Sequence, residues 1–153
     1  MPMRTYLVVI DEHDEARVAL RFAARRAAKT GGSVEILALI APPQFVQWGG
    51  VQAAMEEEAR LRAEALVAQA AGELIEETGL RPAITVRQGD PIAVVRGLLQ
   101  DRPDTAALVL GAAATGSPGL LVQHFAGNAS GTMPCPVMII PGSLSDDALD
   151  RLS

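Results

Sequence analysis

Five short runs of apolar and β-branched residues recur along the chain, and segments with a different periodicity separate them. The first run is apolar or β-branched at every position, which is typical of a parallel strand buried on both faces. The runs are TYLVVI at 5–10, SVEILALI at 33–40, ITVRQ at 84–88, AALVL at 106–110 and PVMII at 136–140. We therefore expect five strands.

The segments between the runs predict four helices. The first begins at Asp14, which we expect to cap it, and ends at Gly31-Gly32. A long helix is expected over about 51–77, a third from Pro91 behind the cap Asp90 to about residue 100, and a short one from Pro118 behind the cap Ser117. The apolar positions of the long helix predict a buried stripe of Ala54, Leu61, Ala65, Ala68, Gly72 and Ile75.

Strands that alternate with helices predict a doubly wound α/β fold. Right-handed crossovers favour a five-stranded parallel sheet of order 3-2-1-4-5 with helices on both faces. Residues 1–142 are expected to form this single domain, and 143–153 a polar, loosely held C-terminal tail. A ligand binds such a sheet where the strand order reverses, which here is beside Asp11 and Gly111.

Composition narrows the classes of partner. The 153 residues carry a formal net charge of -5 and only 3% aromatic residues, which disfavours nucleic acid as a partner. No apolar run reaches the length of a membrane span, so we expect no membrane insertion. A single cysteine, Cys135, cannot form an internal disulfide, and the N-terminus shows no leader pattern. A cytoplasmic location fits these features.

The candidate site residues each have a functional and a purely structural interpretation. Asp11 can accept hydrogen bonds from a ligand or from its own turn, and Gly111 permits either a close approach or a simple turn. His13 and His124 are far apart in sequence, so no metal site is expected. Cys135 is expected to be an unreactive thiol, and no residue is assigned a catalytic role. A phospho-acceptor receiver domain is disfavoured because IIPGS, at the end of the last strand, lacks a lysine.

Several ordered motifs resemble the universal stress protein family: LVVIDEHDEARVALRFAARRA, EILALI, GDP, ALVLG and PCPVMIIPG. The resemblance covers residues 4–142. It implies a five-stranded α/β fold, a homodimer formed through the last strand and, in one branch of the family, ATP binding without rapid turnover. In that branch an aspartate ends the first strand and a backbone group at the end of the second contacts adenine. Asp11 and Leu39 stand at these two positions.

The glycine motif of that branch is degenerate in this chain. The family pattern is G-x-x-G, nine residues, then Gly-Ser or Gly-Thr. Counted from Gly111, Ala114 replaces the second glycine, and His124-Phe125 stands where Gly-Ser is expected. Counted from Gly116, the pattern ends at Ala129-Ser130, but it begins five residues beyond the strand. We therefore expect no phosphate cradle of the family type, although a helix start at 117–119 could still hold one anion.

The nucleotide-binding candidates are the residues nearest the expected crevice between the first and fourth strands. They are Asp11, Leu39, Leu110, Gly111, Ala112, Gly116, Ser117 and Gly119. Basic groups for phosphate are scarce there, because Lys29 is the only lysine and no arginine lies between Arg102 and Arg151.

Taken with the resemblance, these features predict a universal stress-type binding or regulatory protein. We expect it to bind an adenine nucleotide such as ATP, or a related small molecule, with low affinity. A slow ATP hydrolase and a module that binds no nucleotide are the alternatives. A homodimer through Val137–Ile140 is expected, because an apolar edge strand otherwise leaves backbone groups unpaired. The loop containing Phe45 and Trp48 either covers the crevice or joins the dimer contact.

Overall fold

The computed structural model describes residues 4–40 and 49–153, with side chains in the second range from residue 53 onward. Phe45 and Trp48 lie outside the described residues. The strands are β1 (Thr5–Ile10), β2 (Ser33–Ile40), β3 (Ala83–Gln88), β4 (Thr105–Ala112) and β5 (Val137–Pro141). The helices are α1 (Asp14–Thr30), α2 (Gly49–Thr78), α3 (Pro91–Asp101), α4 (Leu120–Phe125) and α5 (Asp146–Leu152), with a 3-10 turn at Ser130–Thr132.

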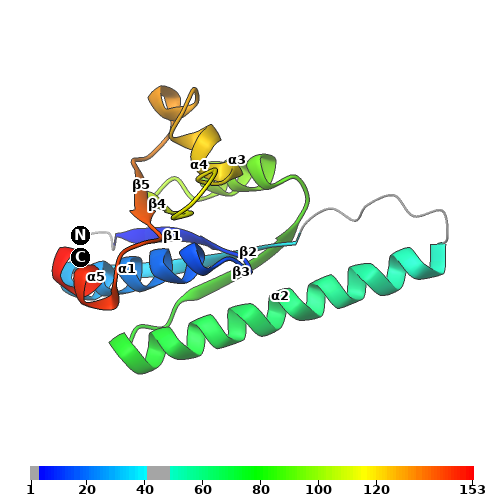
Figure 1. Ribbon diagram of the computed structural model, residues 1–153, viewed down its shortest axis with the longest axis horizontal. Coiled ribbons are helices and arrows are strands. Elements are labelled where there is room, and N and C mark those ends of the chain that lie inside the picture. The colour runs from blue at the N-terminus through cyan, green and yellow to red at the C-terminus, as the bar shows by residue number, and fades with distance from the viewer. Residues whose placement is uncertain (1–3, 41–48) are drawn as a thin grey trace.

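All five strands form one parallel sheet in the order β3-β2-β1-β4-β5, which confirms the predicted fold class (Figure 1). Alternate residues of β1 point to opposite faces, as the two-residue period of a strand requires. Val8 packs in the core beneath α1 and α2, whereas Leu7 packs against α3 and α4. The sheet is therefore covered on both faces, and β1 is at its centre.

Helix α1 buries an alanine-rich face against the sheet, as its apolar spacing predicts. It ends at Gly31, whose φ of 69° is the left-handed conformation that glycine adopts readily. The predicted cap was wrong, because His13 occupies the N-cap position and Asp14 is the first helical residue. At α3 the prediction is confirmed: the carboxylate of Asp90 accepts a 3.0 Å hydrogen bond from the backbone N–H of Ala93.

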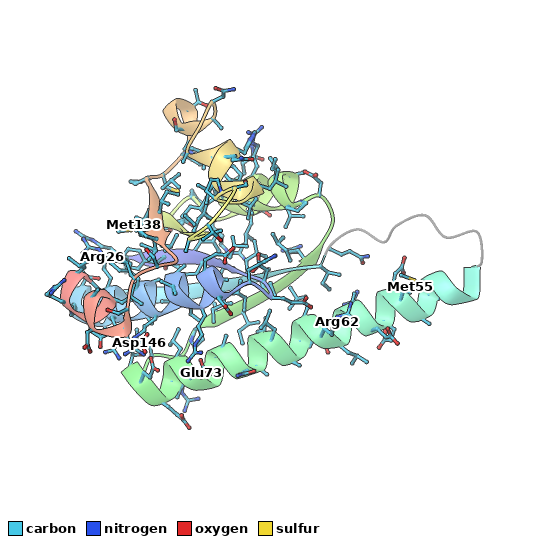
Figure 2. The ribbon with its side chains drawn as sticks, in the orientation of Figure 1. Arg26, Met55, Arg62, Glu73, Met138 and Asp146 are labelled. Carbon is cyan, nitrogen blue, oxygen red and sulfur yellow. The ribbon has the colours of Figure 1, made fainter. Side chains whose placement is uncertain are left out.

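Helix α2 buries a different stripe from the predicted one. Its buried residues are Ala63, Val67, Ala71 and Leu74, while Leu61 and Ile75 of the predicted stripe are 54% and 42% exposed. Both stripes have helical spacing, so the periodicity alone favours neither. The N-terminal half of α2, which carries Met55 and Arg62, extends beyond the sheet (Figure 2).

The C-terminal tail forms α5 and packs beside α1 instead of being loosely held (Figure 1). The Ser145 hydroxyl caps α5 by accepting a 3.2 Å hydrogen bond from the N–H of Ala148. Leu149 is fully buried, and the guanidinium of Arg21 pairs with Asp150 at 3.1 Å. That hydrogen-bonded pair lowers the pKa of the Asp150 carboxyl. None of the helices in the described ranges is long and apolar enough to cross a membrane.

Candidate functional site

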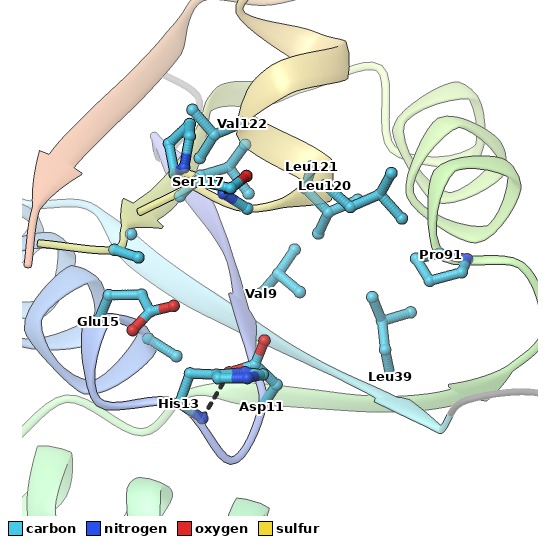
Figure 3. A pocket seen from close by; sticks show the side chains of 16 residues that line it. Val9, Asp11, His13, Glu15, Leu39, Pro91, Ser117, Leu120, Leu121 and Val122 are labelled. Atoms are coloured by element: carbon cyan, nitrogen blue, oxygen red, sulfur yellow. Dashed lines mark hydrogen bonds and ion pairs between the residues drawn. The ribbon is translucent and has the colours of Figure 1, made fainter. Parts of the chain in front are cut away.

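A cavity of about 490 Å³ opens at the carboxyl ends of the central strands, where the order of the sheet reverses (Figure 3). β1 and β4 are hydrogen-bonded neighbours in this sheet, with Val8 opposite Val109. Asp11 and Gly111 consequently lie at the same cavity mouth, as the predicted strand order requires. The cavity is lined by Val9, Asp11, His13, Glu15, Ala16, Leu39, Pro91, Leu110, Gly111, Ala113, Ser117, Pro118, Gly119, Leu120, Leu121 and Val122.

Most of the residues that the sequence assigned to the crevice line this cavity. They are Asp11, Leu39, Leu110, Gly111, Ser117 and Gly119. Ala112 and Gly116 are outside the lining. Ala112 lies opposite Pro141 of β5, and Gly116 occupies a left-handed turn with a φ of 72°.

Asp11 has a local partner as well as a position at the mouth. Its carboxylate accepts a 2.8 Å hydrogen bond from the backbone N–H of His13 and lies 3.2 Å from the Nδ1 atom of that ring. The negative charge of Asp11 raises the pKa of the His13 imidazole. The Asp11 side chain remains 49% exposed, and Figure 3 shows its carboxylate at the cavity. Both interpretations of Asp11 from the sequence therefore have a structural basis.

Gly111 has a packing role that its position at a strand end did not reveal. A Cβ atom on Gly111 would lie 2.5 Å from the carbonyl carbon of Glu15 and 3.1 Å from the Glu15 Cβ. Glycine thus lets the first turn of α1 approach β4 closely, which also places Glu15 at the cavity.

The loop after β4 forms several hydrogen bonds within itself and with α4. The N–H of Ala113 donates to the carbonyl of Pro118 at 3.2 Å, and the N–H of Gly119 donates to the Ser117 hydroxyl at 3.3 Å. Ser117 also accepts a 3.0 Å hydrogen bond from the side-chain amide of Gln123. The expected cap was wrong here, because Gly119 is the N-cap and α4 begins at Leu120. The helix therefore begins two residues later than expected, and the single-anion site at 117–119 stays a prediction.

The second half of the degenerate glycine motif lies away from this cavity. Ala129 lines a separate hollow near α3, with Arg96 and Phe125. The Ser130 hydroxyl donates a 2.6 Å hydrogen bond to the carbonyl of Gly127. His124 lies 3.0 Å from a guanidinium nitrogen of Arg96 through its Nε2 atom and does not line the β1–β4 cavity. Neither register of the motif therefore brings its last residues to the expected crevice.

Sequence reasoning missed the apolar wall that α4 provides. Leu120, Leu121 and Val122 form this wall, opposite Leu39 and Pro91. The only signal was the apolar run LLV directly after the glycine-rich loop. Its position depends on how α4 packs against α3, which local sequence does not specify.

The polar rim of the cavity is acidic. Among the residues that the structure describes there, Asp11 and Glu15 are the carboxylates, His13 is the one titratable nitrogen base, and no lysine or arginine lines the cavity. In the described part of the chain, no three His, Cys, Asp or Glu side chains are grouped so that they could hold a metal. Cys135 lies elsewhere and is half-buried, and burial raises the pKa of its thiol. A raised pKa disfavours the reactive thiolate.

Comparison with known proteins identifies the family. The profile of the Universal stress protein family matches residues 3–141, and no curated protein matches the sequence. The solved structure of the universal stress protein UspA from Lactobacillus plantarum has a TM-score of 0.74 and 18% identity, covering 92% of this chain and 99% of that one.

Two further solved structures are named as nucleotide complexes. A universal stress protein from Archaeoglobus fulgidus in complex with dAMP has a TM-score of 0.58 and 20% identity, covering 91% of this chain and 98% of that one. A universal stress protein in complex with cAMP has a TM-score of 0.63 and 18% identity, covering 92% and 98%. At these identities the structural likeness shows a shared fold, and the sequence profile spans nearly the whole chain. This chain belongs to the universal stress protein family.

Proposed function

We propose that the protein is a binding or regulatory module whose β1–β4 cavity takes an adenine-containing or related small molecule weakly. The supporting observation is the cavity itself, which combines apolar walls with the Asp11 carboxylate at the point where the strand order reverses. Its volume of about 490 Å³ falls within the range of small-molecule sites. The dAMP and cAMP complexes of proteins with the same fold make an adenine ligand the natural first candidate.

A slow ATP hydrolase is the second candidate and has less support. Phosphoryl transfer depends on positioning and on cationic or hydrogen-bonding groups that stabilise the phosphates. Within 4–40 and 53–153, neither a lysine nor an arginine lines the cavity. A module that binds no small molecule is the third candidate.

Two measurements on the purified chain separate these candidates. Mass spectrometry of the supernatant after denaturation identifies any co-purified ligand, and a thermal-shift screen with adenosine, AMP, cAMP and ATP reports binding of added ligand. We expect stabilisation by at least one adenine compound, because a ligand that binds only the folded state raises its stability. An empty cavity and no shift with any compound would leave the interaction module as the remaining function.

A paired substitution locates the binding. Asn at position 11 keeps an oxygen that can accept the His13 N–H, so Asp11→Asn preserves the turn and removes the charge. We expect it to weaken binding about fivefold, the effect of replacing a charged hydrogen-bond acceptor by a neutral one. Asp14→Asn, in the first turn of α1 and outside the cavity lining, is the matched control and should leave the affinity unchanged.

The edge strand β5 offers a surface for self-association. β5 is an edge strand that pairs with β4 on one side only, and its residues Val137 to Ile139 are half-buried. We propose that Val137–Ile140 pairs with the same strand of a second copy, which would satisfy that edge. We also propose a cytoplasmic location, in line with the use of one free cysteine.

A further inference from the structure

We propose that the β1–β4 cavity selects a ligand without phosphate, a purine nucleoside in preference to its nucleotides. This inference rests on the proposed function and concerns the charge class of the ligand. The resemblance suggests ATP as the ligand, but three features of this cavity disfavour phosphate.

The first feature is the acidic rim. Asp11 ends β1 and Glu15 stands in the first turn of α1, and Figure 3 shows both carboxylates at the cavity between the apolar walls. Carboxylates accept hydrogen bonds, so they match the hydroxyl and amino groups of a nucleoside. They repel the negative charges of phosphate, and water-poor apolar walls strengthen that repulsion.

The second feature is that two arginines near the rim already face carboxylates. Arg17 lies in a smaller neighbouring cavity, where its Nε is 4.0 Å from a carboxylate oxygen of Glu73. Arg62 of α2 lies 3.5 Å from Glu12. The sequence of 41–48, the segment after β2, contains no charged residue. His13 can carry a positive charge, but that charge is paired with Asp11.

The third feature is the loop between β4 and α4, where phosphates would need backbone N–H groups. The N–H groups of Ala113 and Gly119 donate within the loop, and Pro118 has none. The six-residue α4 that follows offers the N–H groups of its first turn, at Leu120 to Val122, and its macrodipole is that of a short helix.

The remaining surfaces of the cavity suit a flat, largely apolar group. Val9, Leu39 and Leu110 of the strands and Leu121 and Val122 of α4 are apolar residues that line it. A purine ring buried between such side chains contributes the hydrophobic part of the affinity, and a few polar groups then fix its orientation.

Titration calorimetry of the full chain with adenosine, AMP and ATP tests the inference. The titrations are run at about pH 8, above the ordinary imidazole pKa of 6.5, and ATP is measured both with Mg²⁺ and with EDTA. We expect adenosine to bind about tenfold more tightly than ATP in both buffers, with AMP between them, since each added negative charge faces the acidic rim. ATP binding as tight as adenosine, or tighter, would overturn the inference while leaving the proposed function in place. If none of the three compounds binds, both this inference and the proposed function are wrong.

A charge-neutralising substitution gives an independent readout. Glu15→Gln keeps the backbone contact with Gly111 and removes one rim charge, so the ratio of ATP to adenosine affinity should rise about threefold to tenfold at low salt. Asp14→Asn, next to Glu15 in the first turn of α1 but outside the cavity lining, is the control and should leave that ratio unchanged. A ratio that stays constant in Glu15→Gln, with folding verified by circular dichroism, would contradict the proposed electrostatic selection.

Discussion

Replacing Gly111 by alanine tests whether this glycine serves packing or ligand approach. The added Cβ would lie 2.5 Å from the carbonyl carbon of Glu15 and 3.1 Å from its Cβ, both inside normal van der Waals contact. The carbonyl belongs to the backbone of the first turn of α1, so it cannot rotate away as a flexible side chain would. Accommodation requires the N-terminal end of α1 to move away from β4.

The cost follows from that displacement. Overpacking a well-packed region costs about 1–3 kcal/mol and occasionally more, and an obstacle formed by backbone places Gly111→Ala at about 3 kcal/mol. With a urea m-value of about 2 kcal/mol/M, the unfolding midpoint falls by about 1.5 M. Urea unfolding followed by circular dichroism measures this shift.

Gly72→Ala is the matched control for that substitution. Gly72 lies in α2, and a Cβ there would meet no atom within 4 Å. The same chemical change should therefore stabilise the protein, by about 1 kcal/mol from helix propensity. A Gly111→Ala variant as stable as the wild type would refute the packing argument. If that variant also lost ligand binding, Gly111 would instead serve close approach of the ligand.

Three further outcomes follow from the structure. Leu149→Ala should cost about 2–3 kcal/mol in urea unfolding because it leaves a cavity beneath α5, whereas Leu152→Ala, at a 56% exposed side chain, should be nearly neutral. Asp11→Asn should return the pKa of His13 toward its ordinary value of 6.5, which an NMR titration measures. In the wild type, the pair between protonated His13 and Asp11 stabilises the fold below pH 6.5, and this contribution is lost as the pH rises through the raised pKa of His13. An unchanged His13 titration would argue against the pairing. Sedimentation at micromolar concentration should show a dimer if Val137–Ile140 pairs across a two-fold axis, and a monomer would reject that interface.

The fold was predictable because its signals are local and mutually consistent. Strands buried on both faces appear as continuous apolar runs, and Gly31 and the Asp90-Pro91 pair mark helix ends through their own backbone preferences. Strand order followed from chain connectivity, and it placed Asp11 and Gly111 together.

The features that sequence reasoning missed depend on tertiary packing. Helix α2 has two stripes at helical spacing, and only the contact with β2 and α1 selects the one containing Val67 over the one containing Leu61. Similarly, Ser117 could have capped a helix, but its hydroxyl accepts from Gly119 and Gln123 in the folded loop. The cavity wall formed by Leu121 depends on where α4 packs.

The most direct test of the central claim is an amide chemical-shift titration of the isotopically labelled protein with adenosine. Binding in the β1–β4 cavity predicts shifts concentrated at Asp11, Leu39, Leu110 and Ala113, with the α3-side hollow near Arg96 unchanged. Shifts confined to the Arg96 hollow, or none up to millimolar adenosine, would contradict the assignment of this cavity as the binding site.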